Sequence, residues 1–365
     1  MRAWLVLLAG CGTQWAESTD GGWRILETTL RSNASGNIRV EVRPDAGETA
    51  MLATFLPMEA ERRSHLRYLQ VGNYVPYRAT DETAVTNPFN RSSAAFVTPV
   101  TSLNWPIQDT DGGLLPVKHK LTAGIVDTSS TYTAGTANVS VVFKTDPDPS
   151  GGVLHVNLVY GGDTGQDPAI VAATQAAVEV WRSTYRSVGI ELELLEYTVE
   201  HGSLSAPSQG SAVEYSEIAR TTRLGAVNIV LLENIVGFEG ALGFAGNIPG
   251  PLTPSPVSAV AVDTTLSAGA DGTFDDNDIR LMGETIAHEV GHYLGLYHPV
   301  EGSWSAWDNL DDTPDCTSSQ ECTATLGDNL MFPYPVGCSA QNGCDPQETL
   351  TPEQGAVANH YTGVL

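Results

Sequence analysis

Three of the chain's eight histidines fall within one stretch of eleven residues, HEVGHYLGLYH, at positions 288–298. On an α-helix, residues four apart lie on the same face, so His288 and His292 can point their imidazoles at one ion. Ile286 and Val290 then point the opposite way and can bury the helix in a core. The stretch therefore predicts a helix with one apolar face and one face that carries histidines.

The residues between and after these histidines predict a catalytic zinc site. Glu289 can reach a water molecule activated by zinc without taking a coordination position, and so act as the general base. Gly295 can adopt a left-handed conformation, end the helix and turn the chain back. His298 can then approach as the third ligand, beside His288 and His292. Three nitrogen ligands and one open position are typical of catalytic zinc, whereas structural zinc usually has a fourth protein ligand.

Three alternatives to a catalytic zinc site of this kind stay open. The short H-E-x-x-H pattern occurs by chance in unrelated helices, although the extended pattern is far more constrained. A different class of zinc peptidase uses a distant glutamate as the third ligand, which His298 makes unnecessary. The alternative from another functional class is a surface-anchored binding lipoprotein whose peptidase domain is degenerate.

The charge of the chain argues against one class of partner. Its 43 Asp and Glu residues against 18 Lys and Arg residues give a formal net charge of −25. A surface of this kind repels phosphate backbones, so we predict no nucleic-acid partner.

The first eleven residues resemble an export signal. Arg2 precedes an apolar run, and the stretch 8–11 (Leu-Ala-Gly-Cys) resembles a bacterial lipobox in which Cys11 is lipidated. An ordinary cleaved signal peptide and a misplaced start are the alternatives. We predict a lipoprotein anchored to a bacterial membrane through Cys11 and exposed outside the cytoplasm, at the outer membrane, periplasm or cell surface, with secretion as the alternative.

The four other cysteines lie close together near the C-terminus, at Cys316, Cys322, Cys338 and Cys344. An even number of cysteines in an exported chain predicts two disulfides, with three connectivities open. A structural zinc site usually has tighter C-x2-C pairs, so we favour disulfides.

The segment before residue 148 predicts a β-rich region. Residues 12–30 are short, polar and glycine-containing, as in a tether. From 31 to 147, short runs of β character alternate with turn residues and predict a β-sandwich-like accessory domain. These runs are NIRVEVRP, MLATFLP, AAFVTPV, LTAGIV and ANVSVVFKT. In the first of them, Ile38, Val40 and Val42 share one face.

A different pattern begins after the turn-rich stretch 146–152 and predicts a second domain over 148–365. Strands are expected at 153–160, 190–199, 226–235 and 258–265. A helix is expected after Asp167, which can cap it, with Pro168 at its first position. The acidic stretch 271–278 is expected to be a solvated turn that caps the histidine-bearing helix.

The extended histidine motif resembles the zinc signature of metzincin endopeptidases. Two further stretches resemble the pappalysin-like, or ulilysin-like, branch: DNLDDTPDC (308–316) and LTPEQ (350–354), in which Thr351 can cap a final helix that starts at Pro352. The resemblance covers about residues 150–360. It implies an α/β (α+β) catalytic domain with a twisted mixed sheet and an active-site helix, and a methionine turn at Met331.

The resemblance also implies further site features. Tyr334 would be the hydrogen-bond donor to the transition state, although the family places this tyrosine one residue earlier, where Pro333 stands here. Some members bind calcium through acidic loops like that of Asp308, Asp311 and Asp312, and oxygen ligands suit calcium; a plain acidic turn is the alternative. The resemblance further favours disulfides that join Cys316 or Cys322 to Cys338 or Cys344, across Met331.

The sequence as a whole thus predicts a zinc-dependent endopeptidase that acts outside the cytoplasm on protein or peptide substrates. Zinc is the expected cofactor, and calcium is the second candidate. The N-terminal β-rich region carries no recognisable chemistry.

Overall fold

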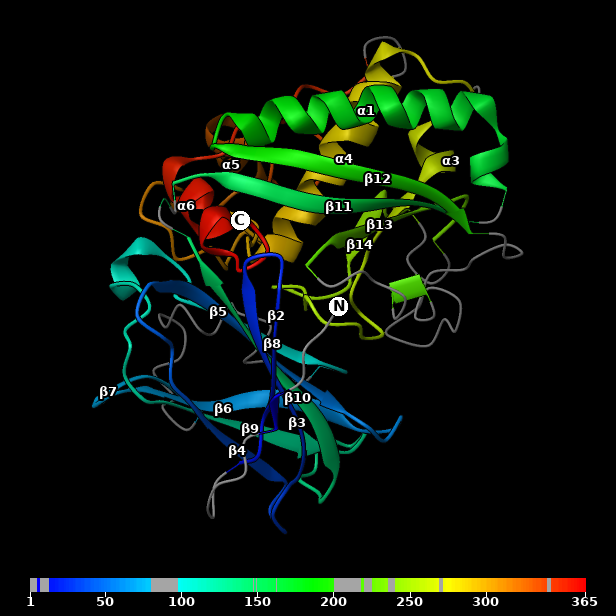
Figure 1. Cartoon of the computed structure of the whole chain (residues 1–365). Helices are drawn as coiled ribbons and strands as arrows, with labels where there is room; N and C mark the ends of the chain where they lie inside the picture. The colour runs from blue at the N-terminus through cyan, green and yellow to red at the C-terminus, as the bar shows by residue number, and fades with distance from the viewer. Residues whose placement is uncertain are drawn as a thin grey trace.

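The computed structural model describes residues 5–6, 13–79, 98–146, 148, 150–161, 163–199, 218–219, 225–235, 240–268, 272–339 and 343–365. Cys11, residues 94–97 of the AAFVTPV stretch and Asp271 lie outside the described residues. Figure 1 shows β-strands of the N-terminal region in the lower part of the view and a mixed layer of helices and strands above them. Among the described residues, no helix is long and apolar enough to cross a membrane.

The N-terminal region consists of two antiparallel sheets. The larger sheet has the strand order β1 (Leu5–Val6), β2 (Ala16–Asp20), β3 (Trp23–Arg31), β10 (Thr136–Thr145), β5 (Glu48–Pro57) and β8 (Thr101–Trp105). The smaller sheet has the order β4 (Asn37–Val42), β9 (His119–Val126), β6 (Arg63–Val71) and β7 (Tyr74–Arg78).

Alternating side chains form the core of this region. The expected strand at 37–42 is confirmed as β4, and its side chains at Ile38, Val40 and Val42 are buried while those between them are exposed or partly exposed. These three side chains belong to one hydrophobic cluster that also includes Phe55 of β5 and Leu66 of β6. The cluster therefore draws on both sheets.

Residues 12–30 do not form the expected tether. Most of them form β2 and β3, which pair with each other from Ala16↔Glu27 to Asp20↔Trp23. The turn between these strands is made by Gly21 and Gly22, both with positive φ (52° and 96°), a conformation that glycine adopts without a steric cost. Trp23 is buried, so this segment belongs to the folded region.

The C-terminal region is built on a five-stranded sheet of order β12 (Ile190–Val199), β11 (Gly152–Gly161), β13 (Val227–Leu232), β15 (Val260–Asp263) and β14 (Gly243–Ala245). The first four strands are parallel, and the edge strand β14 runs antiparallel to β15. The mixed α/β character expected for this part of the chain is confirmed.

In the part of the chain that the structure describes, the helices that accompany this sheet are α1 (Pro168–Arg186), α3 (Thr264–Ser267), α4 (Asp276–Leu294), α5 (Ser319–Leu326) and α6 (Pro352–His360). α1 and α4 pack on one sheet face, where Trp181 and Ile286 share a cluster with Leu158 of β11. Single 3-10 turns lie at η4 (Asp109–Asp111) and η5 (Thr164–Gln166). The expected caps are confirmed, since Asp167 accepts from Ala169 N and Thr351 from Gln354 N.

The acidic stretch before α4 caps the helix as expected, but the helix already includes the last residues of the turn predicted over 271–278. The helix begins at Asp276, because the Asp275 carboxylate accepts hydrogen bonds from the main-chain N–H groups of Asn277 and Asp278, at 2.7 and 3.0 Å. The Asp278 carboxylate accepts from Asp275 N in return, at 3.0 Å. The acidic residues therefore form the cap and first turn of the helix, where negative charge is favourable.

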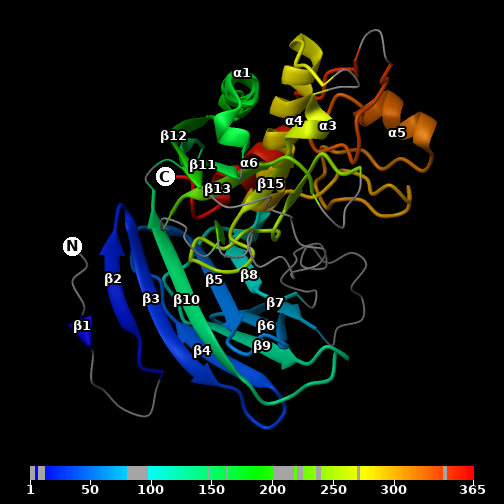
Figure 2. The same cartoon turned by 90° about the vertical axis from the view of Figure 1, so that its right-hand side faces the viewer.

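The end of the chain lies at the junction of the two regions, as Figure 2 also shows. The indole N–H of Trp23 donates to Thr362 O at 2.8 Å. The Lys144 ammonium group donates to the main-chain oxygens of Asn359 and Val364, at 2.8 and 2.9 Å. Trp23 also belongs to the hydrophobic cluster of the C-terminal region, so the two regions share buried surface.

Candidate metal centre

The helix α4 presents two imidazoles on one face. His288 and His292 lie four residues apart, and their ring centroids are 4.7 Å apart. Ile286 and Val290 are fully buried on the opposite side of the helix, as their offset predicts. The apolar face therefore fixes the helix against the sheet and leaves the two histidines facing away from it.

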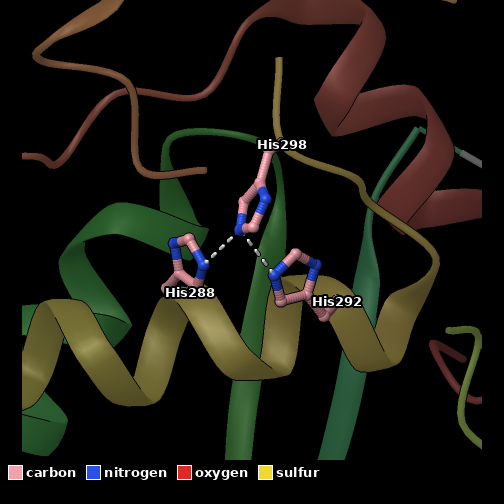
Figure 3. A group of neighbouring side chains, drawn as sticks. All are labelled: His288, His292 and His298. Atoms are coloured by element: carbon pink, nitrogen blue, oxygen red, sulfur yellow. Dashed lines mark hydrogen bonds between the residues drawn. The ribbon is translucent and has the colours of Figure 1, made fainter. Parts of the chain in front are cut away.

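A glycine brings the third imidazole to the other two. Gly295 ends α4 with φ 112°, and its N–H donates to His292 O at 2.9 Å. A left-handed residue at this position reverses the direction of the chain at low cost only if it has no Cβ. His298 consequently returns toward the helix, as Figure 3 shows.

The spacing of the three Nε2 atoms fits a single small cation. His298 Nε2 lies 3.1 Å from His292 Nε2 and 3.3 Å from His288 Nε2. Nitrogen ligands about 2.05 Å from a tetrahedral zinc ion would be about 3.3 Å apart. Among the described residues, these three form the one group of potential ligands whose atoms all lie within 4.8 Å of one another.

The other nitrogen of each ring has a hydrogen-bond acceptor. Nδ1 of His288 lies 2.7 Å from Leu330 O, and Nδ1 of His292 lies 2.8 Å from Leu296 O. These contacts place the proton on Nδ1 and leave Nε2 with a free lone pair, the form that binds metals. Burial, with the neighbouring imidazoles, lowers the pKa of His288 to about 3 and also lowers the pKa of His292. Both rings are therefore neutral at physiological pH.

Glu289 lies beside this group. Burial raises the pKa of Glu289 to about 8, opposed by a hydrogen bond from the main-chain N–H of Ala245. Its side chain also fills the space above Gly243, where a Cβ would stand 2.8 Å from Glu289 Cγ. The edge strand β14 thus fixes the carboxylate through one glycine and one N–H group.

Met331 packs against the helix that carries His288 and His292. It is fully buried, and a Cβ at Gly291 would lie 2.5 Å from its Sδ atom. The preceding residue, Leu330, supplies the carbonyl that accepts from His288. The segment 330–331 therefore supports both the helix and one imidazole.

An open cleft runs past His288 and Glu289. Its walls come from the loop before β14, from α4 and from the segment after Met331, and they include Leu242, Leu281, Phe332, Tyr334 and the disulfide of Cys338 and Cys344. The Tyr334 ring is 39% exposed and packs edge-on against Phe332. The structure thus brings Tyr334 into the same cleft as Glu289.

The acidic residues after the third histidine make hydrogen bonds within their own loop and with the start of α6. The Asp308 carboxylate accepts from the Thr313 hydroxyl. Asp311 N donates to the Glu353 carboxylate at 2.6 Å, and Glu353 N donates to the Asp312 carboxylate at 2.8 Å. These contacts order a turn against the start of α6, and the described residues give no support for calcium there.

The disulfide connectivity expected from the resemblance is wrong. The bonds join Cys316 to Cys322 and Cys338 to Cys344, and each pair is six residues apart in sequence. The first pair is buried with Phe332 in a small cluster, whereas the second borders the cleft. Because both cysteines of each pair lie on the same side of Met331 in the sequence, neither bond spans it.

Four contacts of this site were not predicted from the sequence. Leu330 and Ala245 act through main-chain atoms, which leave no signal in residue type, and Gly243 lies in a strand of only three residues. The carboxylate of Glu301 lies 3.0 Å from His298 Nδ1. An acidic residue three positions after the last histidine was a signal that could have identified this contact.

The chain is similar to extracellular metalloproteases. No protein-family profile matches it. It is 35% identical over 130 residues to an extracellular metalloprotease of Colletotrichum graminicola, covering 33% of this chain and 39% of the relative. It is 27% identical over 139 residues to extracellular metalloprotease 1 of Coccidioides posadasii, covering 38% and 48%. The chain thus spans less than half the length of these two relatives.

Several solved structures align with more than half of the chain. Metalloproteinase-II from Bacteroides fragilis matches 86% of this chain and 81% of its own, at 14% sequence identity and a TM-score of 0.30. A TM-score this low does not establish a shared fold.

Proposed function

We propose that the chain is a zinc-dependent endopeptidase of the pappalysin-like metzincin type, with His288, His292 and His298 as the zinc ligands. The observation that carries this proposal is the convergence of three imidazoles beside Glu289, in an open cleft. The similarity to extracellular metalloproteases supports the same activity.

The residues of the cleft divide the chemistry between them. Zinc held by the three imidazoles supplies Lewis acidity, which polarises a peptide carbonyl and lowers the pKa of water. Glu289 takes the proton from the attacking water and passes it to the leaving amine. Its raised pKa suits both roles, because a group that must accept and then release a proton works best near the operating pH. Tyr334, at the cleft wall, donates a hydrogen bond to the oxygen that gains negative charge.

The proposal also includes the setting of the enzyme. We assign residues 1–11 to an export signal with Cys11 lipidated, 31–147 together with the strands β2 and β3 to an accessory domain, and 148–365 to the peptidase domain. The protein then acts outside the cytoplasm on proteins or peptides. Two disulfides within one short segment are typical of exported proteins.

The test compares metal content and peptide hydrolysis in the full chain and in two variants. We expect one zinc per chain and cleavage of a broad peptide library. Glu289→Gln should keep the zinc and lose several orders of magnitude in rate, because it removes the base and no ligand. Glu179→Gln, an exposed glutamate on α1 with a side chain 66% exposed, is the matched control and should behave like the parent. Full zinc without any hydrolysis in the parent would favour a binding protein with a degenerate peptidase domain.

A further inference from the structure

The third histidine is supported differently from the other two. Nδ1 of His288 and of His292 meets a main-chain carbonyl, whereas Nδ1 of His298 lies 3.0 Å from the side-chain carboxylate of Glu301. His298 stands beyond the end of α4, so no helix fixes its backbone. Of the three imidazoles, it is the one whose hydrogen-bond acceptor can be removed by a single substitution.

The backbone around Glu301 is held in a short hairpin. Val300 and Trp307 form a β-bridge. Glu301 N donates to Ala306 O, and Trp304 N donates to Glu301 O, both at 2.8 Å. Trp304 has a positive φ of 57°, an uncommon conformation for a bulky side chain, which the tight turn imposes. The Cα position of Glu301 is therefore fixed although its side chain is 45% exposed.

Two tryptophans attach this hairpin to the rest of the site. The Trp304 ring packs against Tyr334 with centroids 5.6 Å apart, and against Phe332 at 6.2 Å. The indole N–H of Trp307 donates to Cys316 O at 2.8 Å. The hairpin thus connects Glu301 to the cleft wall and to the segment of the buried disulfide.

We propose that Glu301 is a positioning residue for the third zinc ligand, an inference that rests on the proposed zinc site. Its carboxylate keeps the proton of His298 on Nδ1, orients the ring and makes Nε2 a stronger donor to the cation. Carboxylates that accept from the distal N–H of a metal-bound imidazole typically change metal affinity by about 10- to 100-fold. In this chain the carboxylate acts on His298, the one ligand of the three that lies outside α4.

The competing interpretation is an ordinary surface pair of glutamate and histidine. The same chain contains one: the Glu193 carboxylate lies 3.2 Å from His155 Nδ1, with side chains 71% and 35% exposed. That pair lies on strands β12 and β11, and its histidine is not one of the three converging imidazoles. Glu193→Ala therefore removes the same chemical contact at a site without the metal ligands and is the matched control.

The experiment measures zinc affinity in the full chain by competition with a chromophoric chelator, independently of peptide hydrolysis. Glu301→Ala should weaken zinc binding by about 10- to 100-fold. Glu301→Gln should weaken it less, because the amide oxygen still accepts from Nδ1–H but carries no charge. Glu193→Ala should match the parent. Cobalt substituted for zinc should show an altered visible absorption spectrum only in the Glu301 variants.

The outcomes separate this inference from the proposed function. If the parent chain takes up no zinc, the proposed function fails first. If the parent binds zinc and Glu301→Ala has the parent's affinity and cobalt spectrum, Glu301 has no positioning role. Melting of the metal-free proteins checks the fold of each variant. If Glu301→Ala has a lower melting temperature than the parent, Glu301→Gln is the variant to compare. A zinc affinity and a cobalt spectrum equal to those of the parent in Glu301→Gln would then overturn the proposal.

Discussion

Gly291 and Met331 lie so close that no side chain fits between them: a Cβ at Gly291 would stand 2.5 Å from Met331 Sδ. Gly291 directly precedes His292 on α4, and both residues are buried. A methyl group at Gly291 must therefore displace the methionine or the helix. Because the same helix carries two imidazoles, a displacement of this kind reaches the metal centre.

We expect Gly291→Ala to lower the free energy of unfolding of the metal-free protein by about 1–3 kcal/mol, the usual cost of overpacking a core. Zinc affinity should fall as well. Urea unfolding and chelator competition measure the two effects. Gly302→Ala is the control, since a Cβ there would meet no described atom closer than 4.0 Å. Parental stability and zinc affinity in Gly291→Ala would contradict the packing described here.

The methionine itself gives a complementary prediction. Met331→Ala should cost about 2–5 kcal/mol of unfolding free energy, because it leaves a cavity under the helix. Met331→Leu keeps the volume and should cost less than about 1.5 kcal/mol, with zinc content unchanged, since the sulfur is not a ligand. A loss of zinc in Met331→Leu, which keeps the volume and removes only the sulfur, would assign the sulfur a direct role in metal binding.

Removal of the metal should lower thermal stability reversibly. An ion bound by the folded chain alone stabilises it by about 2.7 kcal/mol when its free concentration is 100 times the dissociation constant. We expect a chelator to lower the melting temperature and added zinc to restore it. In His298→Ala the chelator should have little effect, because only two converging imidazoles remain. An equal shift in that variant would place the stabilising metal elsewhere.

Features that depend only on neighbouring residues could be predicted from the sequence. The convergence of His288, His292 and His298 follows from helix geometry and the turn at Gly295, all within a few neighbouring residues, and the structure brings these three side chains together. β4 was predicted from strict alternation. Each of these features needs only the neighbouring residues to be recognised.

Features that depend on distant residues were missed. The sequence of β3 suggests a polar segment, because the strand contains Glu, Thr and Arg residues. Only its pairing with β10 explains why Trp23 and Ile25 are buried. The two glycines at 21 and 22 are nevertheless a hairpin signal, and the prediction of a tether did not take it into account. The disulfide pairing could not be deduced, because four cysteines allow three connectivities.

The buried lysine at the junction of the two regions gives a further prediction. Lys144 is 1% exposed, donates to two main-chain oxygens of the C-terminal segment and lies 3.4 Å from the Asp146 carboxylate. Lys144→Ala leaves that carboxylate buried without its cation and should cost about 3–5 kcal/mol of unfolding free energy. Lys118→Ala breaks an exposed pair with Glu41 and should cost less than about 1 kcal/mol. Equal costs in urea unfolding would mean that the junction contributes little to stability.

The two disulfides should differ in how easily they are reduced. Cys316 and Cys322 are 1% and 0% exposed, whereas Cys338 is exposed and Cys344 half-buried at the edge of the cleft. A thiolate can attack only a sulfur that it can reach, so a mild reductant should open Cys338–Cys344 first. Because the Arg280 guanidinium donates to Cys344 O, and Gln347 donates to Tyr334 O at 3.2 Å, opening this loop should loosen the cleft wall. We therefore expect partial reduction and alkylation to lower peptide hydrolysis while zinc content stays constant.

Peptide mapping by mass spectrometry identifies the opened bond. The double variant Cys338→Ser with Cys344→Ser should show the same loss of hydrolysis without reductant. Prior opening of Cys316–Cys322, or unchanged hydrolysis in the double variant, would contradict this assignment.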